Sequence, residues 1–376
     1  MRSSIRLGRV FGIPIHLHYT WFIIFALVTF TLGGGYFPTL YLWPWWLYWA
    51  IGIATSLLFF ASVVAHELAH SLVSRYYGVP VRSITLFIFG GVAHISREAS
   101  APFRELAMAI AGPLSSLALS AFFLAVHYLL AGSSEPVGAL AWWLVRINVL
   151  LALFNLIPGF PLDGGRVLRA LWWRISGNFL KATRAAVMAG RAIGYAFMAG
   201  GLAIVLLNGD WLGGLWFAFI GWFLESVAAA SYQQTRLKEA LRGVSAGELV
   251  TQECIIVPPE LTVEALVRDH VLPRGIRCAV VARGGRLGGM LTMANLRGTP
   301  QTEWPYTTVE EAAIPPTRLR VASPTDDVLE VLEKMEEEEI GQVVVVRGEE
   351  VLGVLFRDHI LRYARTRLDL GYGAKA

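Results

Sequence analysis

The stretch Ala65-His66-Glu67-Leu68-Ala69-His70 decides how the rest of this 376-residue chain is interpreted. Residues four apart on a helix share one face, so His66 and His70 can point at one metal ion with the Glu67 carboxylate beside it. This is the arrangement of a zinc hydrolase, with two imidazole ligands and a general base. The preceding residues 45–64 contain no charged side chain. Ionisable groups at the end of such an apolar run are costly in lipid, which favours a functional site over two surface histidines on a soluble helix.

The composition indicates a membrane protein with a polar part attached. The chain is 55% hydrophobic and 16% charged, with a mean hydropathy of +0.53, whereas soluble domains are about 25% charged. Most Asp and Glu lie from Arg242 onward, and the arginines before it cluster in loops, so a pI near 9.1 does not indicate a nucleic-acid surface. Cys254 and Cys278 lack C-x-x-C spacing and suggest neither a disulfide framework nor a zinc site. The first apolar run has no clear cleavage site, so no signal peptide is expected.

Six apolar runs predict six membrane-spanning helices. Their expected bounds are residues 19–32, 45–75, 103–130, 137–156, 185–207 and 211–230. The glycines Gly33-Gly34-Gly35, with Pro38, are expected to end the first span, and the tryptophans between Trp43 and Trp49 to form an interfacial belt. Small residues around Ala111-Gly112-Pro113 in the third span predict close helix contact. A basic amphipathic helix over residues 167–184 is expected before the fifth span.

The loops predict the orientation in the membrane. Lys and Arg occur near the N-terminus, in residues 75–104 and 166–191, and after residue 231, whereas the loops near Gly35, Glu135 and Asp210 have none. The positive-inside rule then predicts a multi-pass protein of the cell membrane with both termini in the cytosol. The same rule places the zinc motif and Asp163 on the cytosolic side.

Residues 78–96 differ from their apolar neighbours. Their β-branched, partly alternating pattern and the pair Gly90-Gly91 predict a hairpin. An open strand edge cannot face lipid, so the hairpin is expected at the membrane surface or beside a cavity near the zinc motif. Its edge could bind an extended peptide, or it could be a plain surface hairpin. Residues 10–18 predict another strand, and His16, His18 and His94 are interpreted as strand side chains and not as ligands.

Two histidines leave a catalytic zinc one protein ligand short. Asp163 is the best candidate, because prolines and glycines interrupt the fourth span just before it, at membrane depth. Irregular backbone at that depth is tolerated only where protein buries it or it lines a watery cavity. The alternative is that Asp163 only caps a helix that begins near Val167. Asn155, at the start of the interruption, could donate its amide to an oxyanion or to the substrate backbone.

From about Gly243 the chain is polar and contains an internal repeat. Ile255-Ile256-Val257 recurs as Leu319-Arg320-Val321, and Gly288-Gly289-Met290-Leu291 recurs as Leu352-Gly353-Val354-Leu355, both at an offset of 64 residues. A shared offset marks a duplicated unit, and each copy predicts the order strand, helix, strand, strand, helix. The expected domains are a membrane domain over residues 1–232, a linker over 233–242, the two copies over 243–306 and 307–370, and a tail over 371–376.

These motifs resemble the site-2 protease family of intramembrane zinc metalloproteases over essentially the whole chain. The stretch from His66 to His70 is similar to the family's first motif. The second motif, N-x-x-P-x-x-x-x-D-G, is matched by Asn155-Leu156-Ile157-Pro158-Gly159-Phe160-Pro161-Leu162-Asp163-Gly164. The hairpin turn of the family resembles Gly90-Gly91-Val92-Ala93. The resemblance implies a helical polytopic fold, and one Zn²⁺ bound by His66, His70 and Asp163 with Glu67 as the base. It also implies a single-span membrane protein as substrate, cut within or near the bilayer to release a cytosolic fragment.

The duplicated tail resembles a pair of cystathionine-β-synthase-type (CBS) domains, which implies a soluble α/β unit for regulation, homodimerisation or substrate positioning. In members that bind adenine nucleotides, a Ser or Thr and then an Asp follow a strand glycine at fixed distances. Thr292 and Asn295 stand at these positions in the first copy, and Phe356 and His359 in the second. Asn295 lacks the carboxylate charge and Phe356 lacks a hydroxyl. Weak nucleotide binding is therefore expected in the first copy and none in the second.

A second hypothesis is a metal or ion transporter gated by the CBS pair, because such pairs also occur on transporters. Glu67 beside the two histidines argues against it, since a permeation site has no need of a general base. A transporter would often show an inverted repeat, and none is visible in this sequence.

Overall fold

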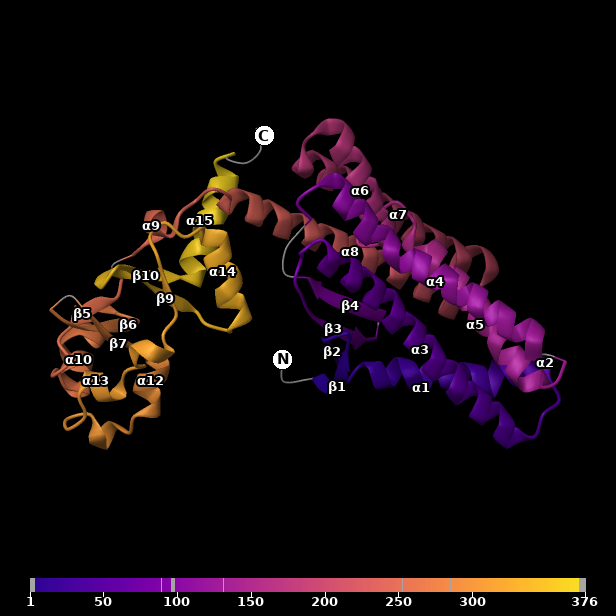
Figure 1. The fold of residues 1–376 in the computed structure, drawn as a ribbon, viewed down its shortest axis with the longest axis horizontal. Coiled ribbons are helices and arrows are strands. Elements are labelled where there is room, and N and C mark those ends of the chain that lie inside the picture. Colours follow the sequence, from indigo (N-terminus) through magenta and orange to yellow (C-terminus); the bar gives the residue numbers. More distant parts are fainter. Residues whose placement is uncertain are drawn as a thin grey trace. The chain divides into compact units, whose positions relative to one another are not determined.

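The computed structural model describes residues 4–88, 90–95, 99–130, 132–251, 253–284 and 286–371. The chain divides into two compact units, Met1–Gln233 and Gln234–Ala376 (Figure 1). The first unit is mainly helical and the second contains a β-sheet with short helices. This agrees with the predicted fold class, a helical polytopic membrane part followed by a soluble α/β part.

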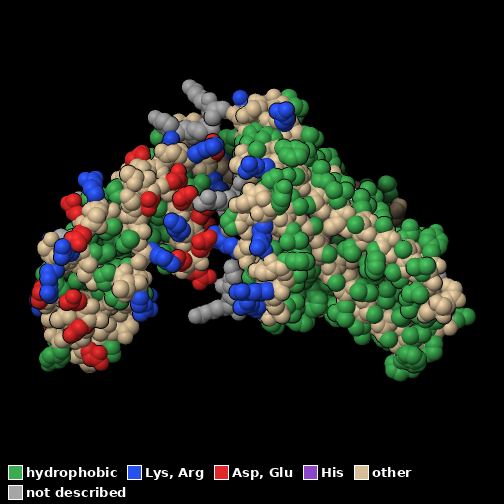
Figure 2. All heavy atoms as spheres, in the orientation of Figure 1, with side chains coloured by type: hydrophobic (Ala, Val, Ile, Leu, Met, Phe, Trp, Pro, Cys, Tyr) green, Lys and Arg blue, Asp and Glu red, His purple; other side chains and the backbone are tan. Residues whose placement is uncertain are grey.

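Six helices among the described residues are long and apolar enough to cross a membrane. The first consists of α1 (Trp21–Thr31), a π-helical turn η1 (Leu32–Tyr36) and α2 (Phe37–Leu40), and the others are α3 (Trp45–Tyr76), α4 (Pro102–Leu130), α5 (Glu135–Asn155), α7 (Phe179–Asn208) and α8 (Trp211–Leu241). These are the six predicted spans. In Figure 2, hydrophobic side chains dominate the surface of this unit, and Lys and Arg gather toward one end of it.

The predicted end of the first span at Gly33-Gly34-Gly35 is wrong, because the helix continues through the glycines to Leu40. In lipid the backbone must satisfy its own hydrogen bonds, so the segment stays helical despite the poor helix propensity of glycine. The glycines instead permit close helix contact. A Cβ on Gly52 of α3 would lie only 3.1 Å from the backbone nitrogen of Gly33.

The helix predicted over residues 167–184 also differs in the structure. Helix α6 (Asp163–Ser176) starts at Asp163 itself, and Gly177 ends it with a left-handed φ of 67°, a conformation that glycine adopts at little cost. Asn178 then caps α7, its side chain accepting a hydrogen bond of 2.8 Å from the Lys181 amide. The fifth span is therefore longer than predicted, since the basic residues from Lys181 onward belong to it.

Four strands form a small sheet in the first unit, in the order β1 (Ser4–Val10), β2 (Ile13–His18), β3 (Val81–Phe87) and β4 (Gly90–Ile95). The predicted hairpin is β3 and β4, and the predicted strand near the N-terminus is β2, with alternate residues buried. The sequence did not predict that β2 and β3 pair in parallel, because this pairing joins segments more than 60 residues apart. Leu17 and Leu86 pack with Trp21 and Phe60, which fixes the sheet against α1 and α3.

The second unit contains a six-stranded sheet in the order β5-β6-β7-β10-β9-β8. Its strands are β5 (Ile255–Val257), β6 (Cys278–Arg283), β7 (Arg286–Thr292), β8 (Val321–Ala322), β9 (Gln342–Arg347) and β10 (Glu350–Phe356). Strands β9 and β10 repeat β6 and β7 at the 64-residue offset, which confirms the internal repeat. The helices α12 (Met293–Gly298), α14 (Val328–Glu337) and α15 (Arg357–Asp369) complete the copies.

The two cysteines are joined in a disulfide, with their Cα atoms 5.0 Å apart. The sequence did not predict this bond, because the expectation of no disulfide framework rested on the spacing of the cysteines along the chain. Strands β5 and β6 are parallel neighbours in which Ile255 pairs with Ala279. This register puts Cys254 and Cys278, each one residue earlier, directly opposite one another.

Candidate metal centre and active site

Helix α3 carries both histidines on its buried face. His66 is 3% exposed and His70 is 4% exposed, and their Nε2 atoms are 3.2 Å apart. The Nδ1 atom of each imidazole ring has a hydrogen-bond partner on α4. Nδ1 of His70 donates to the Met108 carbonyl at 2.7 Å, and Nδ1 of His66 lies 2.9 Å from the Ser116 hydroxyl. Such contacts fix the ring orientation and leave the Nε2 atoms available as ligands.

Asp163 completes a set of three donor atoms. Its Oδ2 lies 3.1 Å from Nε2 of His66 and 3.0 Å from Nε2 of His70, and these three residues form the metal-ligand cluster found among the described residues. Ligands about 2.0–2.1 Å from a tetrahedral zinc stand about 3.3 Å apart. The donor set therefore fits zinc in chemistry and in spacing. Asp163 is the first residue of α6, not its cap, which is Leu162.

A glycine keeps space open beside the donor atoms. The Cβ of any other residue at Gly112, on α4, would lie 2.6 Å from Nε2 of His66 and still closer to Nε2 of His70. The close helix contact predicted around Ala111-Gly112-Pro113 is thus present, and it occurs at the metal-ligand cluster itself. The absent side chain leaves space beside the two Nε2 atoms, so these residues could hold a metal ion.

Glu67 lies against the hairpin. The backbone amide of Ala93, in β4, donates to its carboxylate. A Cβ on Gly91 would lie 2.5 Å from Cγ of Glu67 and 3.1 Å from Cδ, so only glycine fits at this point of the strand. Strand β4 is an edge strand of its sheet. The structure thus places the expected base beside β4, whose outer edge pairs with no further strand among the described residues.

The turn between α5 and α6 is packed backbone against backbone. The amide of Phe160 donates to the Ala186 carbonyl of α7 at 3.1 Å. A Cβ on Gly159 would lie 2.5 Å from Cα of Gly190, and one on Gly165 would overlap the backbone of Gly159 and Phe160. These glycines let the turn lie close to α7 and to the start of α6, which brings Asp163 to the histidines.

Asn155 is the last residue of α5, and its side-chain amide donates to the Leu151 carbonyl one turn earlier at 3.0 Å. Its proposed contact with an oxyanion or a substrate backbone stays a prediction. His16, His18 and His94 lie on β2 and β4 and are not part of the metal-ligand cluster found among the described residues.

The sequence did not identify the residues of α4 that support the site. Met108 and Ser116 hold the two imidazole rings, and Gly112 leaves room beside them. These residues carry no motif. Their spacing of four along a helix puts them on one face, but an apolar span offers many such sets, and only the packing of α3 on α4 selects this one.

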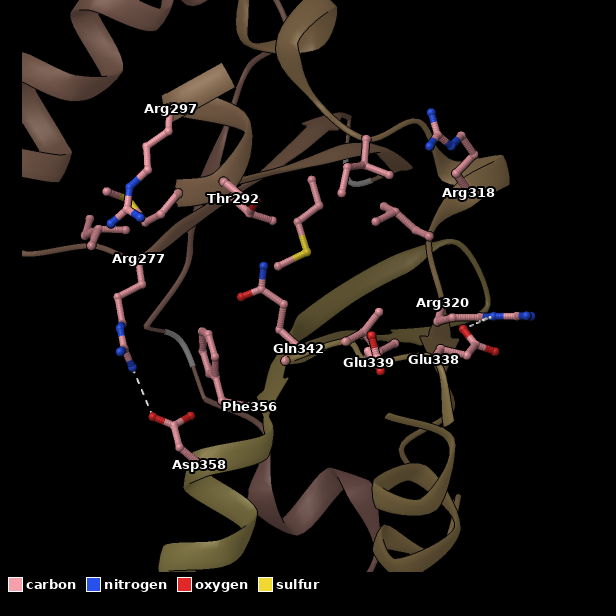
Figure 3. A pocket seen from close by; sticks show the side chains of 18 of the residues that line it. Arg277, Thr292, Arg297, Arg318, Arg320, Glu338, Glu339, Gln342, Phe356 and Asp358 are labelled. Carbon is pink, nitrogen blue, oxygen red and sulfur yellow. Dashed lines mark hydrogen bonds and ion pairs between the residues drawn. The ribbon is translucent and has the colours of Figure 1, made fainter. Parts of the chain in front are cut away.

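The second unit contains a cleft of about 1080 Å³. Figure 3 shows Arg277 and Arg297 on one side of it and Arg318 and Arg320 on the other. Arg320 pairs with Glu338 at 2.6 Å, and Arg277 with Asp358 at 3.0 Å. Burial opposes ionisation of Asp358, but the hydrogen bond from Arg277 outweighs it and lowers the pKa of this carboxyl below its usual value.

The nucleotide candidates Thr292 and Asn295 bond to each other at the edge of this cleft. Their side chains form a capping box at the start of α12, with Oγ1 of Thr292 2.6 Å from Oδ1 of Asn295. Phe356 lines the cleft on the side of the second copy. Binding of an adenine nucleotide stays a prediction, as does the role of His359.

Comparison with known proteins agrees with this geometry. The family model of peptidase family M50 matches residues 54–135 and 130–200, and that of the CBS domain matches residues 309–366. A relative from Synechocystis sp., provisionally named a zinc metalloprotease, is 36% identical over 97% of this chain and 97% of its own length. A zinc metalloprotease of Methanocaldococcus jannaschii is 30% identical over 96% of both chains. The solved site-2 protease of the same organism is 32% identical over 60% of this chain and 94% of that chain, with a TM-score of 0.43.

The protein is thus a zinc metalloendopeptidase, and it is a multi-pass membrane protein. The chain belongs to peptidase family M50, the site-2 proteases, and carries a CBS domain in its C-terminal part. The matched family is one of peptidases, which favours the protease over the alternative of a CBS-gated transporter.

Proposed function

We propose that this protein hydrolyses peptide bonds in the transmembrane segments of single-span membrane proteins and so releases cytosolic fragments. The observation that carries the proposal is the cluster of the buried His66 and His70 with the half-buried Asp163. Both histidines and Glu67 lie on α3, a helix that is apolar enough to span a bilayer, and Asp163 is the first residue of α6. Because both histidines and the expected base lie within a helix of this kind, the substrate is expected to reach the site in the membrane.

In this proposal His66, His70 and Asp163 hold one zinc ion. Zinc bound there supplies a Lewis acid that polarises the scissile carbonyl and lowers the pKa of the attacking water. Glu67 accepts the proton of that water and passes it to the leaving amine. The Ala93 amide, which donates to Glu67, helps to fix the position of this carboxylate.

Strand β4 is proposed to bind the substrate as an added strand. A helical peptide bond is shielded and its carbonyl is already bonded, so the substrate has to unwind before it is cut. An edge strand offers unpaired backbone groups to an extended peptide. Gly91 lies against Glu67, so a peptide on this edge would pass close to the base. Asn155 is proposed to donate to the substrate backbone or to the oxyanion.

The cytosolic location of both termini and of the site remains part of the proposal and rests on the positions of Lys and Arg in the loops. The CBS pair is proposed to act as a dimerisation or substrate-positioning module, with only weak binding of adenine nucleotide in its first copy.

The decisive test replaces the proposed base. Glu67→Gln removes the proton acceptor and leaves the three metal donors in place, so zinc content should be unchanged while cleavage of a single-span test substrate is lost. Zinc is measured by mass spectrometry on protein purified in detergent, and cleavage by mapping the fragments. Glu225→Gln, a change in α8 away from the metal-ligand cluster, is the matched control. Normal cleavage by Glu67→Gln would refute the mechanism.

A further inference from the structure

A buried ion pair lies outside the reaction chemistry and connects α4 to α6. Arg169 donates from Nε to Oε1 of Glu105 at 2.6 Å, and its Nη2 donates to the same oxygen. The Arg169 side chain is 8% exposed and the Glu105 side chain is fully buried. Two charges are costly to bury, so a pair at this depth calls for an explanation beyond stability.

Arg169 also lies against two aromatic rings. Its guanidinium lies 4.9 Å from the ring centre of Phe160 and 4.7 Å from that of Phe179. Phe160 belongs to the turn before Asp163, and Phe179 begins α7. The guanidinium therefore joins four parts of the protein: α4, the turn, α6 and the start of α7.

The residues that contact the site lie along one face of α4. Glu105, Met108, Gly112 and Ser116 follow one another at spacings of three and four residues, which places them on one side of the helix. Met108 and Ser116 hold the histidine rings. Glu105 holds Arg169, six residues after Asp163 on α6, which is less than two helical turns away. Helix α4 thus contributes no metal ligand, yet it contacts the elements that carry all three.

We infer that Glu105 and Arg169 are positioning residues, which hold α6 in register with α4 so that the Asp163 carboxylate meets the two imidazoles. The inference rests on the proposed metal site and adds to it. The pair is not part of the metal-ligand cluster found among the described residues. Oε2 of Glu105 is buried without a hydrogen-bond partner among the described residues, so the pairing with Arg169 is the main support of this carboxylate.

The test compares a single with a double replacement. Arg169→Met leaves the buried Glu105 carboxylate unpaired, whereas the double variant Glu105→Met/Arg169→Met leaves no unpaired charge and fills the same space, so it should fold. Both should hold zinc about 10- to 100-fold more weakly than the unaltered protein, as when a group that orients a ligand is lost. In both, kcat should fall with little change in KM.

The readouts are zinc affinity by chelator competition, the visible spectrum of the cobalt-substituted protein, and the thermal midpoint, all on the full chain in detergent. The matched control is Arg191→Met, which breaks the Arg191–Glu225 pair between α7 and α8 and should leave zinc affinity and cobalt spectrum unchanged. A double variant with unaltered zinc affinity and cobalt spectrum would overturn the positioning role. If the unaltered protein binds no cobalt, or Asp163→Ala binds it equally well, the proposed metal site fails instead.

Discussion

Gly112 shows how a single missing side chain maintains this site. Because a Cβ there would press on both Nε2 atoms, we expect Gly112→Ala to displace the imidazoles and to reduce zinc occupancy and activity strongly, even though alanine favours the helix. Zinc content and cleavage are measured together, with circular dichroism to show that the helices persist. Gly35→Ala, at a position with open space around it, is the control. Full zinc occupancy in Gly112→Ala would contradict the assigned role of this glycine.

Among single residues, the sequence predicted the three metal donors that the structure brings together and missed the residues that orient them. The histidines and Glu67 lie in one local motif, and Asp163 lies in an interruption that lipid would not tolerate without a reason. Met108, Ser116 and the Glu105–Arg169 pair act through contacts between helices. Such contacts depend on how α3, α4 and α6 pack, and no local pattern contains that information.

Helix α7 supports the turn that places Asp163 beside the two histidines. A Cβ on Gly190 would overlap the Phe160 carbonyl, so Gly190→Val should push the turn away from α7. Overpacking of this kind costs about 1–3 kcal/mol, and here it should also weaken zinc binding. Thermal midpoint and zinc affinity are compared with those of Gly200→Val, whose Cβ would meet only a Phe217 side chain at 3.3 Å. Equal zinc affinity in the two variants would show that α7 does not position the turn.

The elements also show where sequence patterns fail. The bounds of α3 and α4 were predicted within a residue or two, because charge and length limit a membrane span. The π-helical turn at Gly33 and the break at Gly177 were not predicted. Glycine has the same sequence signal whether it ends a helix or allows two helices to touch, and only the neighbouring helix distinguishes these cases.

For the whole molecule, the orientation can be tested directly. Cysteines placed at Gly35, Glu135 and Asp210 should react with a membrane-impermeant reagent added outside the cell, and cysteines at Lys181 and Lys238 should react only after permeabilisation. The natural cysteines are replaced by serine for this experiment. Labelling of Lys238→Cys in intact cells would refute the cytosolic location of the second unit.

Binding of adenine nucleotides by the second unit can also be tested. Because the Asn295 side chain is bonded to Thr292 and Phe356 has no hydroxyl, ATP, ADP and AMP should bind weakly at one site of the full chain and not at a second. Calorimetry on detergent-solubilised protein measures the affinity and the number of sites. Thr292→Ala should remove the remaining binding, while Thr325→Ala serves as control. Micromolar binding at two sites would favour nucleotide control of the protease.

The turn between α5 and α6 has little regular structure, yet its amides are largely bonded. Gly159 donates to Ile157, Phe160 to Ala186 and Leu162 to Gly159, at 2.8–3.1 Å. These protons should therefore exchange with deuterated solvent far more slowly than those of an ordinary loop, at rates closer to those of the flanking helices. A segment so protected keeps the Asp163 carboxylate in place between turnovers. If these protons exchange as slowly as expected, the motion that admits a substrate is expected in elements other than this turn.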